Sequence, residues 1–163
     1  MGTENILPPR HRFERSSYEM ISKIFLAWCL IALCVSIHAA GVTSALRWLH
    51  RQRPFSEQFW PCTWLFVRLA GWIILFHLFE IIAWALVYLW TGAMPDAHSA
   101  FYFSSVTYTT TGYGDLVLPR DWHFVGGVEA LTGMLMAGWS TGFFFAVVSQ
   151  IYDLDPREST VEK

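Results

Sequence analysis

The sequence predicts an all-helical membrane protein, and three observations support this class. Hydrophobic residues make up 54% of the 163 positions, with nine tryptophans and thirteen phenylalanines, which is too apolar for a soluble domain of this size. Three long segments carry few or no charges, and each exceeds the roughly 20 residues that a spanning helix needs. A fourth apolar segment, 97–109, is too short to cross and leads into a stretch rich in threonine and glycine.

Composition also excludes several functional classes. The net charge is only −2, and no basic patch suggests a nucleic-acid partner. The three cysteines (Cys29, Cys34 and Cys62) lack metal-ligand spacing and are interpreted as free, small apolar residues. No nucleophile–base pair or phosphate-binding loop indicates an enzyme, and no cofactor is expected.

The chain begins with a polar tail, 1–23, of mixed charge. Pro8 and Pro9 argue against a helix at its start. We therefore expect a solvated tail, or an interfacial helix that begins near Ser16.

The region 24–62 is predicted to hold an extra membrane helix followed by a basic loop. Residues 24–46 contain no Asp, Glu, Lys or Arg, and 47–62 is basic and aromatic, as at a cytoplasmic interface. Two alternatives stay open: the small residues at 39–41 resemble the end of a cleaved signal peptide, or the segment lies along the inner interface. His38, alone on an apolar helix, is interpreted as a hydrogen-bonded interior residue rather than a metal ligand.

Residues 63–91 predict a second long helix. His77 and Glu80 are spaced i, i+3 and therefore share one face of it. Three aromatic residues are expected to mark its far interface with water: Trp84, Tyr88 and Trp90.

The short segment 97–109 predicts a half-helix that enters the membrane and stops. Asp96 or Ser99 is expected to cap its start. The partial negative charge at its C-terminal end, about half an elementary charge, favours a nearby cation. Residues 122–151 predict the last spanning helix, and 153–163 a short cytoplasmic tail.

Between these two helices, 110–114 reads Thr-Thr-Gly-Tyr-Gly, and Asp115 follows. Gly112 and Gly114 adopt positive φ angles easily, and alternating handedness turns successive carbonyl groups to one side. Irregular backbone at membrane depth is tolerated where protein buries it or where it lines a water-filled path.

This motif and its flanks resemble the potassium-channel pore family over roughly 63–152, with an extra hydrophobic segment added to the small bacterial-type unit of two spanning helices. The family more often has valine at the position of Thr111. The resemblance implies a homotetramer of outer helix (63–91), pore helix (97–109), filter (110–114) and inner helix (122–151), in a cell membrane and in contact with lipid. It also implies K⁺ as the permeant ligand. The implied ion-binding residues are Thr110, Thr111, Gly112, Tyr113 and Gly114.

The resemblance also implies residues that control the filter. Tyr102 and Asp115 stand where family members place a hydrogen-bonded brace behind the filter, while Val106 replaces a carboxyl group that some members carry. Gly133 and Gly138 are candidates for the gating hinge of the inner helix. Close helix packing through small residues is the alternative interpretation of both glycines.

Two carboxylates, Glu80 and Glu129, fall inside predicted spans. Charges there are costly, about 2.5–3.5 kcal/mol at the helix centre, so such residues are usually paired, neutral or functional. Their expected partners are Ser105, Thr107 and Tyr108 of the half-helix, or His77. Two interpretations stay open: a structural brace for the pore, or a pH-sensitive control of the filter.

Orientation follows from the filter, which faces outward in the family. If residues 24–46 span the membrane, the N-terminus then lies outside. Arg10, Arg12 and Arg15 would lie outside with it, whereas basic residues usually remain on the cytoplasmic side. There are two alternatives to a conducting channel: a subunit of a potassium transporter built from pore-loop repeats, and a non-conducting regulatory membrane subunit. The intact motif disfavours both.

Overall fold

The computed structural model describes residues 9–51 and 59–151, and within them the secondary structure is entirely helical. The predicted all-helical class is therefore confirmed. The predicted tail 153–163 lies outside the described residues. The elements are α1 (Pro9–Arg51), α2 (Phe59–Trp90), α3 (Ala97–Tyr108), the 3₁₀ turn η1 (Arg120–Trp122) and α4 (His123–Ile151).

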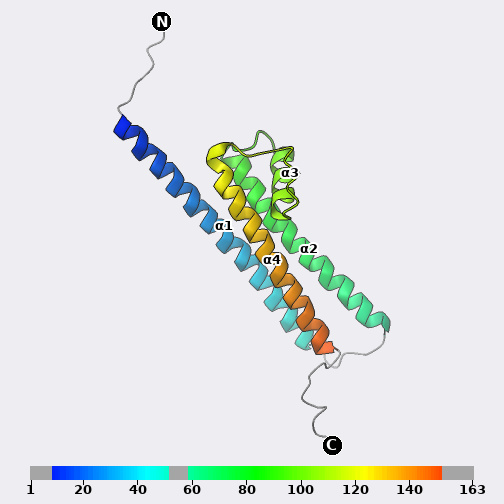
Figure 1. Cartoon of the computed structure of the whole chain (residues 1–163). Helices are drawn as coiled ribbons and strands as arrows, with labels where there is room; N and C mark the ends of the chain where they lie inside the picture. The colour runs from blue at the N-terminus through cyan, green and yellow to red at the C-terminus, as the bar shows by residue number, and fades with distance from the viewer. Residues whose placement is uncertain (1–8, 52–58, 152–163) are drawn as a thin grey trace, which may run out of the picture.

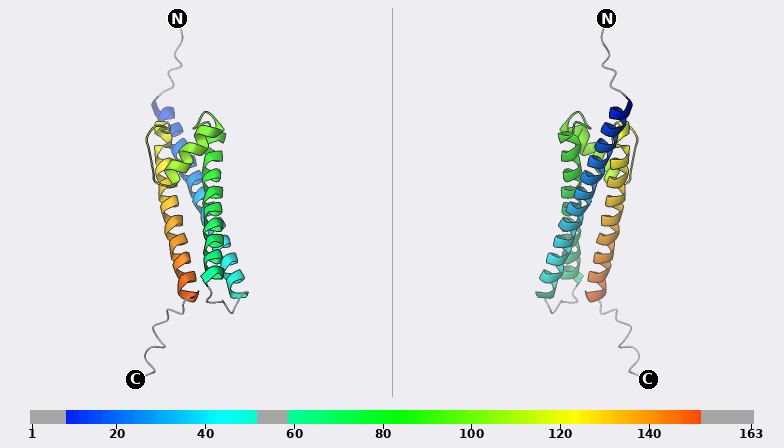
Figure 2. Two further views of the ribbon diagram at one scale, coloured as in Figure 1. Left: turned by 90° about the vertical axis from the view of Figure 1, so that its right-hand side faces the viewer. Right: turned by 90° about the vertical axis from the view of Figure 1, so that its left-hand side faces the viewer.

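Three long helices form a bundle, and the short α3 packs against α2 and α4 near one end of it (Figures 1 and 2). Helix α1 runs in the same direction as α4 and antiparallel to α2. Each long helix contains a segment long and apolar enough to cross a membrane, namely Tyr18–Trp48, Trp60–Trp90 and Arg120–Ser149. The protein is therefore a multi-pass membrane protein. Since α1 lies lengthwise along the other two, its geometry favours a spanning helix over an interfacial one.

Helix α1 is longer than the sequence predicts. It begins at Pro9 rather than near Ser16. Proline is tolerated at the first helical position because the backbone N–H that it lacks has no partner within the helix there. The predicted loop 47–62 is also too long, since α1 continues to Arg51 and α2 already begins at Phe59. Basic residues near the C-terminal end of α1 interact favourably with the negative end of the helix dipole. The basic stretch is therefore compatible with a helix that continues into it.

The core beside α3 is rich in aromatic side chains. Tyr88 is fully buried and makes edge contacts with the rings of Phe103 and Trp122. Trp84 is fully buried as well, so the prediction that Trp84 and Tyr88 mark the water interface is wrong. Only Trp90, which is 82% exposed, fits that role, because Tyr88 packs against Phe103 of α3 and Trp84 lies beside Cys34 of α1.

An ion pair joins α1 to the segment that precedes α4. Lys23 binds the carboxylate of Asp121, and its ammonium group lies 4.9 Å from the centre of the Trp122 ring. This contact fixes the N-terminal half of α1 at the end of the bundle that carries α3.

Candidate functional site

The backbone of 110–114 alternates in handedness. Gly112 and Gly114 have φ angles of 51° and 78°, as their lack of a side chain allows. Thr110 also has a positive φ, 58°, and is the only non-glycine residue that does so in the described part of the chain. Positive φ thus recurs at every second residue, which is the condition for successive carbonyl groups to face one side.

This stretch is attached to the last turn of α3 by its backbone. Thr110 N–H donates to Thr107 O at 2.9 Å, and Gly112 N–H donates to Val106 O at 3.0 Å. The rest of the stretch is open: Tyr113 is 71% exposed in the single chain. Residues 110–114 are therefore largely exposed along one edge of the chain.

Asp96 caps α3, as one of the two predicted alternatives. Ser99 N–H donates to Asp96 Oδ1 at 2.9 Å, and the Ser99 hydroxyl donates to Oδ2 at 2.8 Å. The backbone hydrogen bond from Ser99 holds the pKa of the Asp96 carboxyl below its ordinary value. The cap fixes where α3 starts, and α3 ends at Tyr108, shortly before residues 110–114.

Tyr102 and Asp115 meet across the loop that follows α3. The Tyr102 hydroxyl donates to Asp115 Oδ2 at 2.7 Å. This hydrogen bond lowers the pKa of Asp115 and raises the pKa of Tyr102. The structure thus brings together the two residues that the resemblance pairs.

Glu129 of α4 is fully buried where α2, α3 and α4 meet. The Tyr88 hydroxyl donates to its Oε2 at 2.7 Å, and Ser104 of α3 hydrogen-bonds to its Oε1. The Ser104 hydroxyl also lies 2.9 Å from the carbonyl oxygen of Ile81. These partners differ from the expected ones, because the side of α3 that faces α4 carries Ser104 instead.

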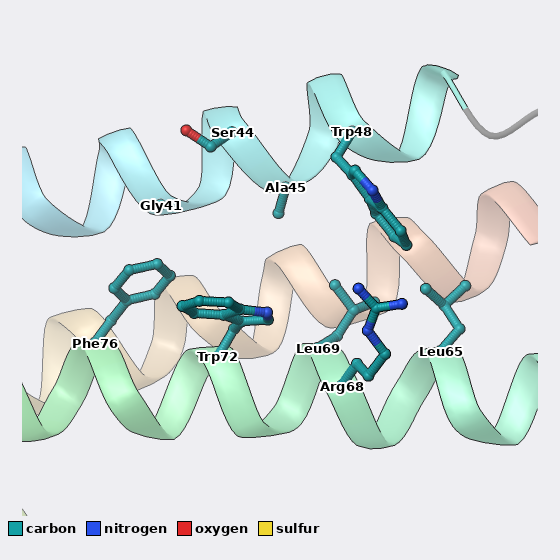
Figure 3. Close-up of a pocket in the computed structure, with 9 residues that line it drawn as sticks. All are labelled: Gly41, Ser44, Ala45, Trp48, Leu65, Arg68, Leu69, Trp72 and Phe76. Carbon is teal, nitrogen blue, oxygen red and sulfur yellow. The ribbon is translucent and has the colours of Figure 1, made fainter.

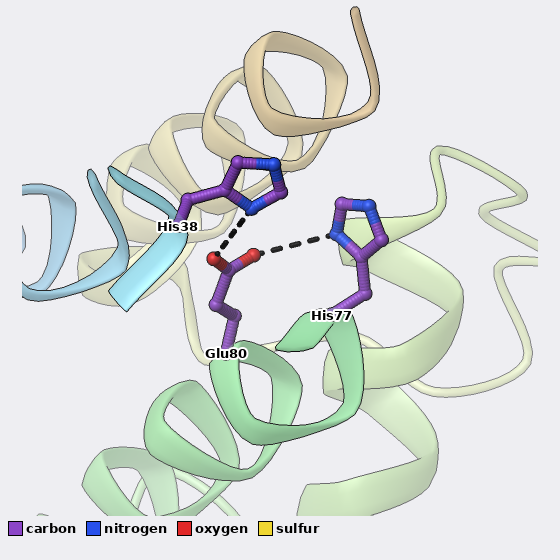
Figure 4. Close-up of side chains that lie close together, drawn as sticks. All are labelled: His38, His77 and Glu80. Carbon is purple, nitrogen blue, oxygen red and sulfur yellow. Dashed lines mark hydrogen bonds and ion pairs between the residues drawn. The ribbon is translucent and has the colours of Figure 1, made fainter. Parts of the chain in front are cut away.

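Glu80 of α2 is fully buried at the C-terminal end of α3. Tyr108 donates its hydroxyl to Oε2, and His77 Nδ1 lies 3.4 Å from the same oxygen. Both are among the partners expected for Glu80. The structure adds His38 of α1, whose Nδ1 lies 3.2 Å from Oε1 (Figure 4).

The role of His38 is the main feature that sequence reasoning missed. An interior hydrogen-bonded histidine was expected, but not that it joins Glu80 and His77 in one cluster. No local pattern could have shown this, because His38 and Glu80 are 42 positions apart and meet only when α1 packs against α2.

The two hinge candidates have different surroundings. A Cβ atom on Gly133 would lie 1.9 Å from the carbonyl oxygen of Tyr108, so glycine is needed for α4 to approach the end of α3. A Cβ atom on Gly138 would meet nothing within 4 Å. Gly133 therefore has a packing role, and the hinge interpretation stays a prediction for both glycines.

A hollow lies between α1 and α2, toward the end of the bundle away from α3 (Figure 3). Its volume is about 310 Å³, and its lining is mainly apolar. The guanidinium group of Arg68 lies 4.9 Å from the centre of the Trp48 ring at this hollow. The lining residues are Gly41, Ser44, Ala45, Trp48, Leu65, Arg68, Leu69, Trp72 and Phe76.

Comparison with known proteins gives one match. A family model described as "Ion channel" matches residues 63–150, which is more than half of the chain. No curated protein matches the sequence. No solved structure matches it either.

Proposed function

The chain belongs to the ion channel family whose model covers residues 63–150, and on that premise we propose that it forms a potassium-selective pore. The observation that carries the proposal is the alternation of backbone handedness at Thr110, Gly112 and Gly114. This alternation suits a row of carbonyl oxygens that faces one axis. Such rows replace the hydration shell of K⁺ in potassium channels.

In this mechanism, K⁺ moves passively down its electrochemical gradient. The carbonyl oxygens take the place of the water that the ion loses, and the Thr110 hydroxyl adds a further oxygen at the inner end of the row. Several weak sites in series let each ion leave as the next one enters. The negative end of α3 stabilises a cation just below the filter. The carbonyl groups belong to Thr110, Thr111, Gly112 and Tyr113.

The proposed assembly is a homotetramer in contact with lipid. One chain supplies one wall of a pore, and a closed ring of identical walls needs rotational symmetry. The open edge at 110–114 supports this arrangement, as does an apolar and largely exposed face of α4. That face carries Leu131, Met134, Leu135 and Trp139. The apolar hollow between α1 and α2 suits a lipid acyl chain.

The proposed orientation places the filter outside the cell. Because α1 is tied to Asp121, the N-terminal end of α1 lies on the same side as the filter. The region between α1 and α2 is then cytoplasmic, as expected from its basic residues. The cell membrane is the proposed location, and no nucleic-acid partner is proposed.

Flux through liposomes tests the proposal. Purified protein is expected to pass K⁺ much faster than Na⁺, and Ba²⁺ is expected to block the flux. Gly112→Ala should abolish it, because an L side chain is strained at a φ of 51°. Gly71→Ala is the matched control, since its Cβ would meet nothing within 4 Å. Equal K⁺ and Na⁺ flux in the wild type would overturn the selectivity.

A further inference from the structure

The cluster around Glu80 joins all four α-helices of the described chain. His38 comes from α1, His77 and Glu80 from α2, Tyr108 from α3 and Ser140 from α4. Four of these residues are buried, and His77 is only partly covered. His38, His77 and Ser140 have no role in the ion path proposed above, so the cluster needs a separate explanation.

The hydrogen bonds of the cluster do not balance while both imidazoles are neutral and Glu80 is ionised. The Ser140 hydroxyl has one proton, yet its oxygen lies 3.0 Å from Nε2 of both His38 and His77. Both Nδ1 atoms face Glu80, whose Oε2 already accepts from Tyr108. With N–H groups on both Nδ1 atoms, one Nε2 must also be a donor. The cluster therefore needs one more positive charge.

A divalent cation on the Nδ1 side supplies that charge and agrees with both contacts to Ser140. Each imidazole then keeps its proton on Nε2, and both N–H groups donate to the two lone pairs of Ser140. Metal-bound histidines usually donate their other N–H to such an outer oxygen, which fixes the ring orientation. Within the described residues, no lysine or arginine forms an ion pair with Glu80 that would compete for its charge.

The separations between the facing atoms fit a small four-coordinate ion. Bonds of about 2.0–2.1 Å in a tetrahedron place neighbouring ligand atoms roughly 3.3 Å apart. His38 Nδ1 lies 3.2 Å from Glu80 Oε1, and His77 Nδ1 lies 3.4 Å from Glu80 Oε2. The Tyr108 hydroxyl donates to Glu80 Oε2, so it holds the carboxylate and is not itself a ligand. One ligand atom from each of His38, His77 and Glu80 can be chosen so that all lie within 4.8 Å of one another.

We propose that His38, His77 and Glu80 bind a divalent transition-metal ion of the zinc type through both Nδ1 atoms and the carboxylate. Tyr108 holds the carboxylate by its hydrogen bond, Ser140 orients the two imidazoles, and the fourth position is open to water. Two imidazoles and one carboxylate form a donor set that zinc accepts in proteins. The partly exposed ring of His77 is the side from which the ion enters.

Zinc binding to the purified protein tests this site without any measurement of conduction. Wild type is expected to bind one Zn²⁺ per chain. His38→Gln and His77→Gln should each weaken binding by more than about tenfold, since even outer partners of a metal site contribute that much. His98→Gln and His123→Gln are matched controls away from the cluster, and they should bind as the wild type does.

Two further measurements keep the test decisive if a histidine variant unfolds. Co²⁺ bound to wild type should show the strong visible absorption of a four-coordinate ion with nitrogen and oxygen ligands. Ser140→Ala keeps all the ligands, so it should bind zinc about 10–100-fold more weakly than wild type. Absence of saturable zinc binding in wild type would overturn the proposal. Undiminished binding by folded His38→Gln and His77→Gln proteins would overturn it as well.

Discussion

Thr110 combines a β-branched side chain with a φ angle of 58°, a region that such residues rarely occupy. A residue held there costs about 1–3 kcal/mol and persists only where its surroundings enforce it. The hydrogen bond from Thr110 N–H to Thr107 O supplies part of this enforcement. The backbone entering the filter is thus held in a strained form by the end of α3, and contacts behind the filter matter accordingly.

The bond between Tyr102 and Asp115 is one such contact, and its removal should make the filter less stable. We expect Asp115→Asn and Tyr102→Phe each to speed inactivation, measured as the decay of K⁺ current under sustained activation. Because both changes remove the same charge-assisted bond, the double variant should decay little faster than either single variant. An unchanged inactivation rate in Asp115→Asn would show that the bond does not brace the filter.

The same bond has a defined pH dependence. The pKa of Asp115 is lowered in the folded protein, so the bond stabilises the fold fully above the ordinary value of 3.8 and fades as the pH falls through the folded-state pKa. Inactivation of wild type should therefore be insensitive to pH near neutrality and should accelerate in this acidic range. Tyr102→Phe should lose most of that acid sensitivity, which recordings over the same pH range would check.

Among the elements, α4 approaches the C-terminal end of α3 closely at Gly133. Gly133→Ala places its Cβ against the Tyr108 carbonyl, so we expect a loss of about 1–3 kcal/mol of stability, as for other overpacked cores. Thermal denaturation in detergent measures this loss. Gly138→Ala is the matched change in the same helix and should leave the denaturation temperature unchanged or raise it. Equal stability of the two variants would contradict the packing role of Gly133.

Glu129 connects α2, α3 and α4 through hydroxyl groups. The single proton of Ser104 satisfies both of its contacts only if it goes to Ile81 O while Glu129 donates to Ser104. A glutamine amide reproduces this pattern, with its NH₂ toward Ser104 and its carbonyl toward Tyr88. Glu129→Gln should therefore keep the stability and flux of wild type.

Glu129→Leu removes both hydrogen bonds and serves as the contrast. It leaves the buried Tyr88 hydroxyl without its acceptor and the Ser104 hydroxyl without its donor, at about 1–3 kcal/mol for each unsatisfied group. Thermal denaturation should separate it clearly from Glu129→Gln. If Glu129→Gln were as damaging as Glu129→Leu, an ionised carboxylate would be required. If flux through Glu129→Gln lost a pH dependence that wild type shows, the pH-control interpretation would return.

The elements themselves were largely predictable, because long apolar runs and a short half-helix follow from composition and from the motif at 110–114. Their ends were not: Pro9 starts a helix that its proline seemed to forbid. Side-chain partners were harder still. Tyr88 looked like an interface residue until α3 covered it, and His38 looked isolated because its partner lies on another helix. Periodicity within one helix cannot show which face another helix will cover.

At the scale of the whole molecule, the number of chains around the pore follows from mixing experiments. Wild-type and Gly112→Ala chains can be mixed before assembly. If one altered chain stops conduction through a tetramer, the remaining flux should equal the fourth power of the wild-type fraction. An equal mixture should then keep about 6% of the flux. A dimeric pore would keep about 25%, and that result would exclude the tetramer.

The long helices also exceed the thickness of a typical membrane. The candidate span in α1 has 31 residues, or about 46 Å of helix, while the hydrocarbon core is about 30 Å thick. Such helices tilt to match the bilayer, and the tilt changes with its thickness. Helix α1 is tied to Asp121 through Lys23 in its N-terminal half and to Glu80 through His38 near its middle, so we expect a change in its tilt to pull on both flanks of the proposed filter. We therefore expect conduction to respond to lipid chain length through α1, the helix that lies outside the family-matched residues.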